Sequence, residues 1–184
     1  MKKIVFCFFL LCLLTGCKKS KLIEIKTYPE TYVLAYEQDH GHCYDSVPYS
    51  VVSLDLYSEG LSLDTNHRML GTGYNLYLSD IFVPGDTLTP GEYKSLNSKH
   101  STLNSYTFLP GRDYDGTPNG AYLLTIDKGL LQSIQLIDSG YMSVRDTTNG
   151  LADIRFTLYY TKEDRSVVTY TPSFQGPLHL WQKQ

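Results

Sequence analysis

The chain has 184 residues, of which 42% are hydrophobic and 19% are charged. This composition is typical of one globular domain and excludes a disordered chain or a coiled coil, and a body of this size buries enough surface to fold without disulfides or a metal. The formal net charge is −3, and the body beyond residue 26 is acidic, so it would repel a phosphate backbone and nucleic acid is not expected as a partner.

Residues 1–16 have the pattern of an export signal. Two lysines precede an unbroken apolar run over residues 4–14, which is too short to span a bilayer and has the length of a signal-peptide core. The motif Leu14-Thr15-Gly16-Cys17 follows and resembles the lipobox of bacterial lipoproteins. This resemblance implies cleavage before Cys17, a diacylglycerol on its sulfur, and an acyl chain such as palmitate on its new amine. The alternative is an ordinary secretory signal that leaves a free cysteine.

Residues 17–26 contain the expected lipidated Cys17 and a short basic neck. The neck holds four lysines and one glutamate, which suits anionic headgroups; a solvated tether is the alternative. Lys18 follows Cys17, so the aspartate that retains some Gram-negative lipoproteins in the inner membrane is absent, as is an acidic export stretch. We therefore expect an outer-membrane lipoprotein whose body faces the periplasm, with surface exposure left open.

Residues 27–184 form the expected body, which reads as a series of short strands. Apolar and polar side chains alternate with period two, and turn sequences such as Asp127-Lys128-Gly129 separate the runs. In chain order, the predicted strands are 31–37, 50–58, 74–79, 91–96, 106–109, 121–127, 133–137, 141–145, 153–160, 167–171 and 178–181.

Strands with one polar face favour an all-β fold, a single antiparallel β-sandwich of Ig-like or jelly-roll-like type, with a lipocalin-like barrel as the alternative. The order of elements over residues 45–181 resembles little-characterised β-sandwich lipoproteins of Gram-negative gut anaerobes. The similarity rests on Pro90-Gly91-Glu92-Tyr93 and on the closing Phe174-Gln175-Gly176-Pro177-Leu178. It implies export, lipid anchoring and an all-β fold, and it transfers no catalytic residue.

The densest cluster of ligand-type side chains is the segment 39–45, DHGHCYD. On an extended strand, His40 and His42 would share one face and Cys43 would lie on the other, so these three are weak candidates for a zinc or copper site. No second cluster with ligand spacing accompanies them. The sequence therefore favours a polar loop bent at Gly41, and neither a metal nor any other cofactor is expected.

The cysteine count excludes an intramolecular disulfide in the mature chain. Of the four cysteines, Cys7 and Cys12 lie in the expected signal and Cys17 carries the lipid, which leaves Cys43 alone. Because an exposed thiol is disfavoured in an oxidising compartment, we expect Cys43 to be buried or reduced.

The segment 111–120 is the longest turn-rich stretch. Asp113, Asp115 and Gly116 begin like a calcium loop, but the fifth position is Thr117 and the twelfth is Leu124, which are not the ligands that a calcium loop needs. A surface loop is the better interpretation.

Tyrosine is unusually abundant, with 16 copies. By strand parity, Tyr74, Tyr122 and Tyr160 point with aliphatic residues and are expected in the core. A second group points with polar residues and would form an exposed aromatic binding face if its strands were neighbours. This second group consists of Tyr49, Tyr57, Tyr77 and Tyr159. The alternative is that these four rings pack under loops or cover the sheet.

No nucleophile elbow, zinc-protease motif, phosphate loop or dinucleotide fingerprint is present in the sequence, so we expect no enzyme. The sequence predicts a membrane-anchored lipoprotein with a non-catalytic binding or structural module that recognises a glycan or an envelope protein. Two alternatives remain open. An internal cavity would favour a periplasmic carrier of a small apolar ligand or metal, and a cleft holding two carboxylates ~5–10 Å apart would favour a hydrolase with a loop-built site.

Overall fold

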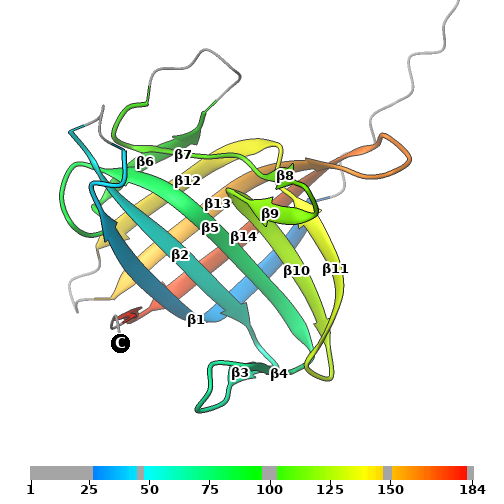
Figure 1. Cartoon of the computed structure of the whole chain (residues 1–184). Coiled ribbons are helices and arrows are strands. Elements are labelled where there is room, and N and C mark those ends of the chain that lie inside the picture. Colours follow the sequence, from blue (N-terminus) through cyan, green and yellow to red (C-terminus); the bar gives the residue numbers. More distant parts are fainter. Residues whose placement is uncertain (1–26, 45–47, 97–102, 147–150, 182–184) are drawn as a thin grey trace, which may run out of the picture.

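The computed structural model describes residues 27–44, 48–96, 103–146 and 151–181, and the regular elements in these ranges are all β-strands (Figure 1). The strands are β1 (Thr27–Gly41), β2 (Ser50–Ser58), β3 (Leu61–Leu63), β4 (Met69–Gly71), β5 (Gly73–Val83), β6 (Gly91–Ser95), β7 (Thr107–Phe108), β8 (Arg112–Tyr114), β9 (Thr117–Asn119), β10 (Ala121–Asp127), β11 (Leu130–Leu136), β12 (Ser139–Asp146), β13 (Ala152–Thr161), β14 (Val167–Gly176) and β15 (Leu178–Leu180).

Eight strands close into a barrel in the order β5-β2-β1-β14-β13-β12-β6-β7, and β7 pairs back onto β5. Most neighbours are antiparallel, but β1 runs parallel to β14 and β6 runs parallel to β7, so the barrel is mixed. Strands β10 and β11 extend from the first half of β5, and β15 pairs with the end of β1 (Figure 1).

The all-β prediction is confirmed, whereas the sheet closes on itself rather than dividing clearly into the two layers of the favoured sandwich. Closure depends on β5, whose first residues pair with β10 while Ile81 and Phe82 pair with β7. Alternation along a strand reports which faces are buried and carries no information on whether two distant edges meet. The barrel alternative is therefore closer, although the parallel pairs distinguish this barrel from the up-and-down lipocalin type.

The interior of the barrel is filled by large side chains that the strands direct inward. An eight-stranded barrel has an interior that side chains alone can fill. Fully buried members of this core include Tyr32, Leu54, Leu56, Leu76, Leu78, Tyr93, Phe108, Met142, Ile154, Leu158 and Phe174.

One end of the barrel is covered by the loop between β5 and β6. Leu88 of this loop joins the core, and its backbone N–H donates a hydrogen bond to the buried Glu37 carboxylate at 2.5 Å. Tyr93 fixes the same loop because its hydroxyl donates to the carbonyl of Thr89 at 2.8 Å.

A smaller apolar cluster lies outside the barrel, where the β3–β4 hairpin packs near β2. Tyr57, Leu61 and Ile126 form its buried part. Strand β2 is consequently buried on both faces, whereas the alternating pattern of residues 50–58 predicts burial of one face only. Within the ranges that the structure describes, no helix is long and apolar enough to cross a bilayer.

Candidate functional site

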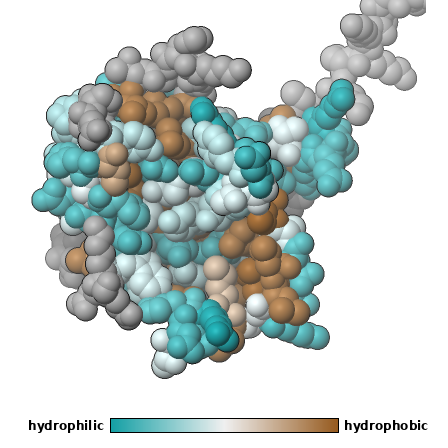
Figure 2. Space-filling view, in the orientation of Figure 1, coloured by the Kyte–Doolittle hydropathy of each residue, from teal (hydrophilic) through white to brown (hydrophobic). Residues whose placement is uncertain are grey.

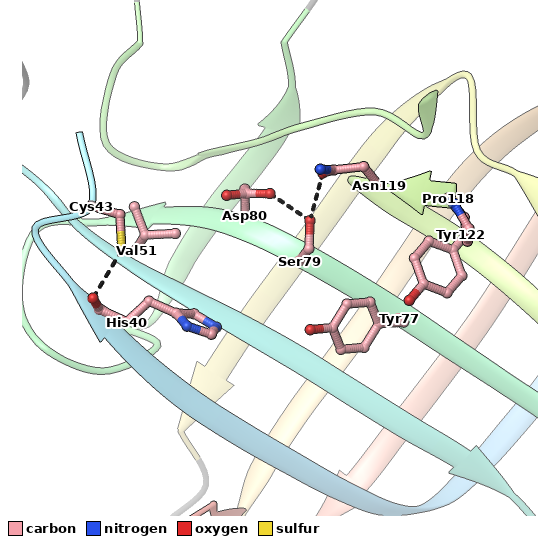
Figure 3. Close-up of a pocket in the computed structure, with 9 residues that line it drawn as sticks. All are labelled: His40, Cys43, Val51, Tyr77, Ser79, Asp80, Pro118, Asn119 and Tyr122. Atoms are coloured by element: carbon pink, nitrogen blue, oxygen red, sulfur yellow. Dashed lines mark hydrogen bonds between the residues drawn. The ribbon is translucent and has the colours of Figure 1, made fainter. Parts of the chain in front are cut away.

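A groove of about 400 Å³ lies on the outer surface of β2, β5 and β10, and we call it the outer groove (Figure 3). Its lining residues are His40, Cys43, Val51, Tyr77, Ser79, Asp80, Pro118, Asn119 and Tyr122. Figure 2 shows that a surface of mixed polarity covers this region and adjoins an apolar area over β10 and β11. The exposed apolar side chains of β11 are Leu130, Leu131 and Ile134.

Strand pairing places two aromatic rings side by side in the outer groove. Leu76 and Leu78 point into the barrel, so Tyr77 between them points outward. Tyr122 is the direct cross-strand partner of Tyr77, and the two ring centroids are 5.2 Å apart with 38° between the ring planes. Cross-strand aromatic pairs of this kind stabilise a sheet. Here the pair also gives the groove a broad amphipathic wall.

The opposite part of the groove is polar. The Ser79 hydroxyl lies within hydrogen-bonding distance of the Asp80 carboxylate and the Asn119 side-chain oxygen, and it accepts a hydrogen bond from the N–H of Gly120 (Figure 3). Tyr44 donates its hydroxyl hydrogen to Asp80 at 3.1 Å. These contacts fix the carboxylate and the amide in place, as a binding site requires.

His40 closes the groove on the side of β1. Its Nε2 lies 3.0 Å from the hydroxyl of Ser53 on β2. Cys43 lies beside it, and its thiol donates to the carbonyl of His40 at 2.9 Å. Cys43 is exposed, which excludes the buried form of the expected thiol, and its reduced state stays a prediction.

The phenols of the groove are neutral hydrogen-bonding groups at physiological pH. Burial, followed by the nearby Tyr77 and Asp55, raises the pKa of Tyr122 to about 12. Burial and the Asp80 charge likewise raise the pKa of Tyr44 to about 12. The side chains of the groove therefore offer hydroxyl and amide donors together with one carboxylate acceptor.

This set of groups is suited to binding a polar molecule. Asp80 is the carboxylate among the described residues that line the groove, and it can accept hydrogen bonds from the hydroxyl groups of such a molecule.

Of the three weak metal candidates, the structure brings His40 and Cys43 together and separates His42. β1 ends at Gly41, whose φ of +66° breaks the alternation on which a shared histidine face depended. His42 points elsewhere, with Nδ1 3.2 Å from the carbonyl of Tyr49. Among the residues that the structure describes, no group of three or more His, Cys, Asp or Glu side chains is arranged to hold a metal.

The four tyrosines of the expected aromatic face are distributed over the fold. Tyr57 is 2% exposed and hydrogen-bonds to Asp55, Tyr49 lies half-buried before β2, and Tyr159 lies on β13, three strands from β2 in the barrel. Tyr77 alone reaches the outer groove.

Sequence reasoning missed Tyr122, Asp80 and Asn119 as groove residues. Tyr122 was expected in the core because β10 carries apolar side chains on both faces, and Ala121 and Leu123 are the ones that join it. The Asn119-Gly120 pair signals a turn, but only the pairing of β10 with β5 brings it beside Asp80. Of the other tyrosines expected in the core, Tyr74 is 40% exposed and Tyr160 packs partly against the core.

The turn-rich segment forms the β8–β9 hairpin, whose last strand supplies Asn119. Asp113 accepts a hydrogen bond from the N–H of Gly116 at 2.7 Å and so closes the turn. The carboxylate that opens the calcium-like sequence therefore has a structural role.

Comparison with known protein families, with characterised proteins and with solved structures finds no match to this chain.

Proposed function

We propose that this protein is a membrane-anchored lipoprotein whose barrel binds a glycan non-catalytically in the outer groove. The observation that carries the proposal is the combination of the Tyr77–Tyr122 ring pair with the fixed side chains of Asp80 and Asn119 in one groove. A sugar has an apolar C–H face and an edge of hydroxyl groups. Tyrosine rings suit the former, and carboxylate and amide groups suit the latter.

The size of the groove favours a saccharide over a protein partner. About 400 Å³ lies within the range of small-molecule sites, about 300–1,000 Å³. A stable protein interface instead needs about 800 Å² from each partner, with a central apolar anchor. A glycan unit fits the first description.

The anchor and the location belong to the same proposal. Cys17 lies outside the described residues, and its acylation is inferred from the lipobox alone. The proposed location is the outer membrane, with the barrel facing the periplasm and membrane lipid as the partner of Cys17. Envelope glycans would be within reach of the groove there.

Ligand-observed NMR with a panel of neutral mono- and disaccharides tests the binding. We expect at least one saccharide to bind the full chain in nonionic detergent, and Tyr122→Ala and Asp80→Asn each to weaken it about tenfold or more. Tyr141→Ala is the matched control, because Tyr141 is an exposed tyrosine on β12 outside the groove. Equal losses in the control and in Tyr122→Ala would contradict the proposal, as would the absence of binding across the panel.

A further inference from the structure

A second cleft opens where two strand edges face each other without pairing. β13 runs past the start of β12, since Tyr159 is the last β13 residue paired with that strand. Beyond it, Tyr160 and Thr161 pair with β14 on one side, and the other edge of β13 faces β11, which pairs with β10 alone. Gln135 on β11 joins these two edges, because its Nε2 donates a hydrogen bond to the carbonyl of Thr161 at 3.3 Å. A cleft of about 370 Å³ lies here, and we call it the lateral cleft.

Phenol groups surround the inner part of the lateral cleft. The hydroxyls of Tyr170 and Tyr32 lie 2.6 Å apart in a buried position. Burial raises the pKa of Tyr170, and the nearby Glu30, Tyr74 and Tyr160 raise it further. The phenols are therefore neutral, and they present oxygen lone pairs and electron-rich ring faces. Such rings attract cations.

The lateral cleft also contains the carboxylate of Glu30. Glu30 is half-buried, and burial raises its pKa. Lys162 lines the exposed rim of the same cleft. A positively charged ligand beside Glu30 would favour the ionised form of this carboxylate.

We propose that the lateral cleft binds an organic ammonium ion with a short apolar or aromatic body. The ammonium group would lie against the Glu30 carboxylate and the rings of Tyr74 and Tyr160, and the apolar body would rest on Leu123. The volume of the cleft is within the range of small-ligand sites. The site is separate from the outer groove and does not depend on the function proposed for it.

Two probes of equal size isolate the role of the positive charge. Isothermal titration of the full chain in nonionic detergent at neutral pH compares 2-phenylethylamine, which is protonated, with 2-phenylethanol, which is neutral. We expect saturable binding of the amine and at least about tenfold weaker binding of the alcohol. Equal binding of the two, or no saturable binding of the amine up to tens of millimolar, would overturn the proposal.

Charge variants with opposite expected effects separate binding from misfolding. Glu30→Gln keeps the shape of the side chain and should weaken amine binding about tenfold or more, while binding of the alcohol stays the same. Lys162→Met removes a like charge from the rim and should strengthen amine binding a few-fold. Asp115→Asn removes one negative charge at an exposed turn outside both clefts and should leave amine binding as it is. Equal losses in Glu30→Gln and Asp115→Asn would show general attraction to an acidic body and would reject the site.

Discussion

The alternation of apolar and polar residues along β2 predicts that the Asp55 carboxylate faces solvent, but the fold buries it. Its two oxygens accept hydrogen bonds from the Tyr57 hydroxyl and the Asn75 amide, each at 2.5 Å. Burial still dominates and raises the pKa of Asp55, although both hydrogen bonds act in the opposite direction. The ionised side chain therefore carries a net cost in the folded state.

This cost gives the stability of the protein a defined pH dependence. The unfolded chain loses the Asp55 proton near pH 3.8 and the folded chain loses it at a higher pH. Between the two pKa values the folded state binds more proton, so the contribution of Asp55 to the free energy of unfolding falls as pH rises. The Asp55→Asn variant has no titrating group at this position. The free energy of unfolding of the variant minus that of the parent chain should therefore increase from about pH 3.8 upward and then level off. Urea denaturation at a series of pH values measures this difference.

Asp115→Asn is the control for the general loss of one negative charge, because Asp115 lies at an exposed turn. Parallel pH profiles for the Asp55 variant and the parent chain would contradict this account of the buried carboxylate.

At the scale of the element, the β9–β10 connection positions the polar side of the outer groove. Gly120 has a φ of +76°, and an added Cβ would lie 2.1 Å from the carbonyl oxygen of Pro110. Its N–H and carbonyl both hydrogen-bond to Ser79. A side chain at this position must therefore displace the backbone that holds Asn119.

Gly116 provides a matched comparison for this contact. It has a similar φ of +84°, but nothing lies within 4 Å of an added Cβ. Gly120→Ala should thus cost at least about 1 kcal/mol more free energy of unfolding than Gly116→Ala. Chemical denaturation measures the difference. Equal costs would show that the close approach to Pro110 relaxes freely.

The loop over the end of the barrel allows a similar paired test. Leu88→Ala removes a buried side chain of the core and should lower the free energy of unfolding by about 2 kcal/mol or more. Thr87→Ala changes the exposed neighbour and should cost less than about 0.5 kcal/mol. An equal and small effect of both changes would mean that the loop contributes little to the closure of this end.

Period-two alternation predicted the strands well where one face is buried over several residues. β2 and β10 begin and end at the predicted residues, 50–58 and 121–127. The hairpins β3–β4 and β8–β9 were missed, because strands of three residues are too short to show a period. The outer groove escaped prediction for a related reason, since its two sides come from strands whose pairing local alternation does not reveal.

At the scale of the whole molecule, closure of the barrel depends on the two residues of β7. Thr107 and Phe108 pair with β5 on one side and with β6 on the other. So short a strand is indistinguishable in sequence from a loop that happens to contain Phe. Pairings between segments far apart in the chain thus decide between a sandwich and a barrel. The lateral cleft lies where β11, which pairs with β10 alone, is left out of the closed barrel.

The proposed attachment of the body to a membrane also belongs to this scale. The neck of residues 18–26, fully extended, spans at most about 30 Å, so acylation of Cys17 would hold the barrel near the bilayer. One acyl chain gives marginal binding and two or three give stable anchoring. Cys17→Ser should therefore move the protein from the membrane fraction to the soluble fraction and abolish labelling by a palmitate analogue. Cys43→Ser is the matched control, since it removes the exposed thiol of the body and should leave both properties unchanged. Labelling that persists in Cys17→Ser and disappears in Cys43→Ser would place the lipid on the barrel and contradict the lipobox interpretation.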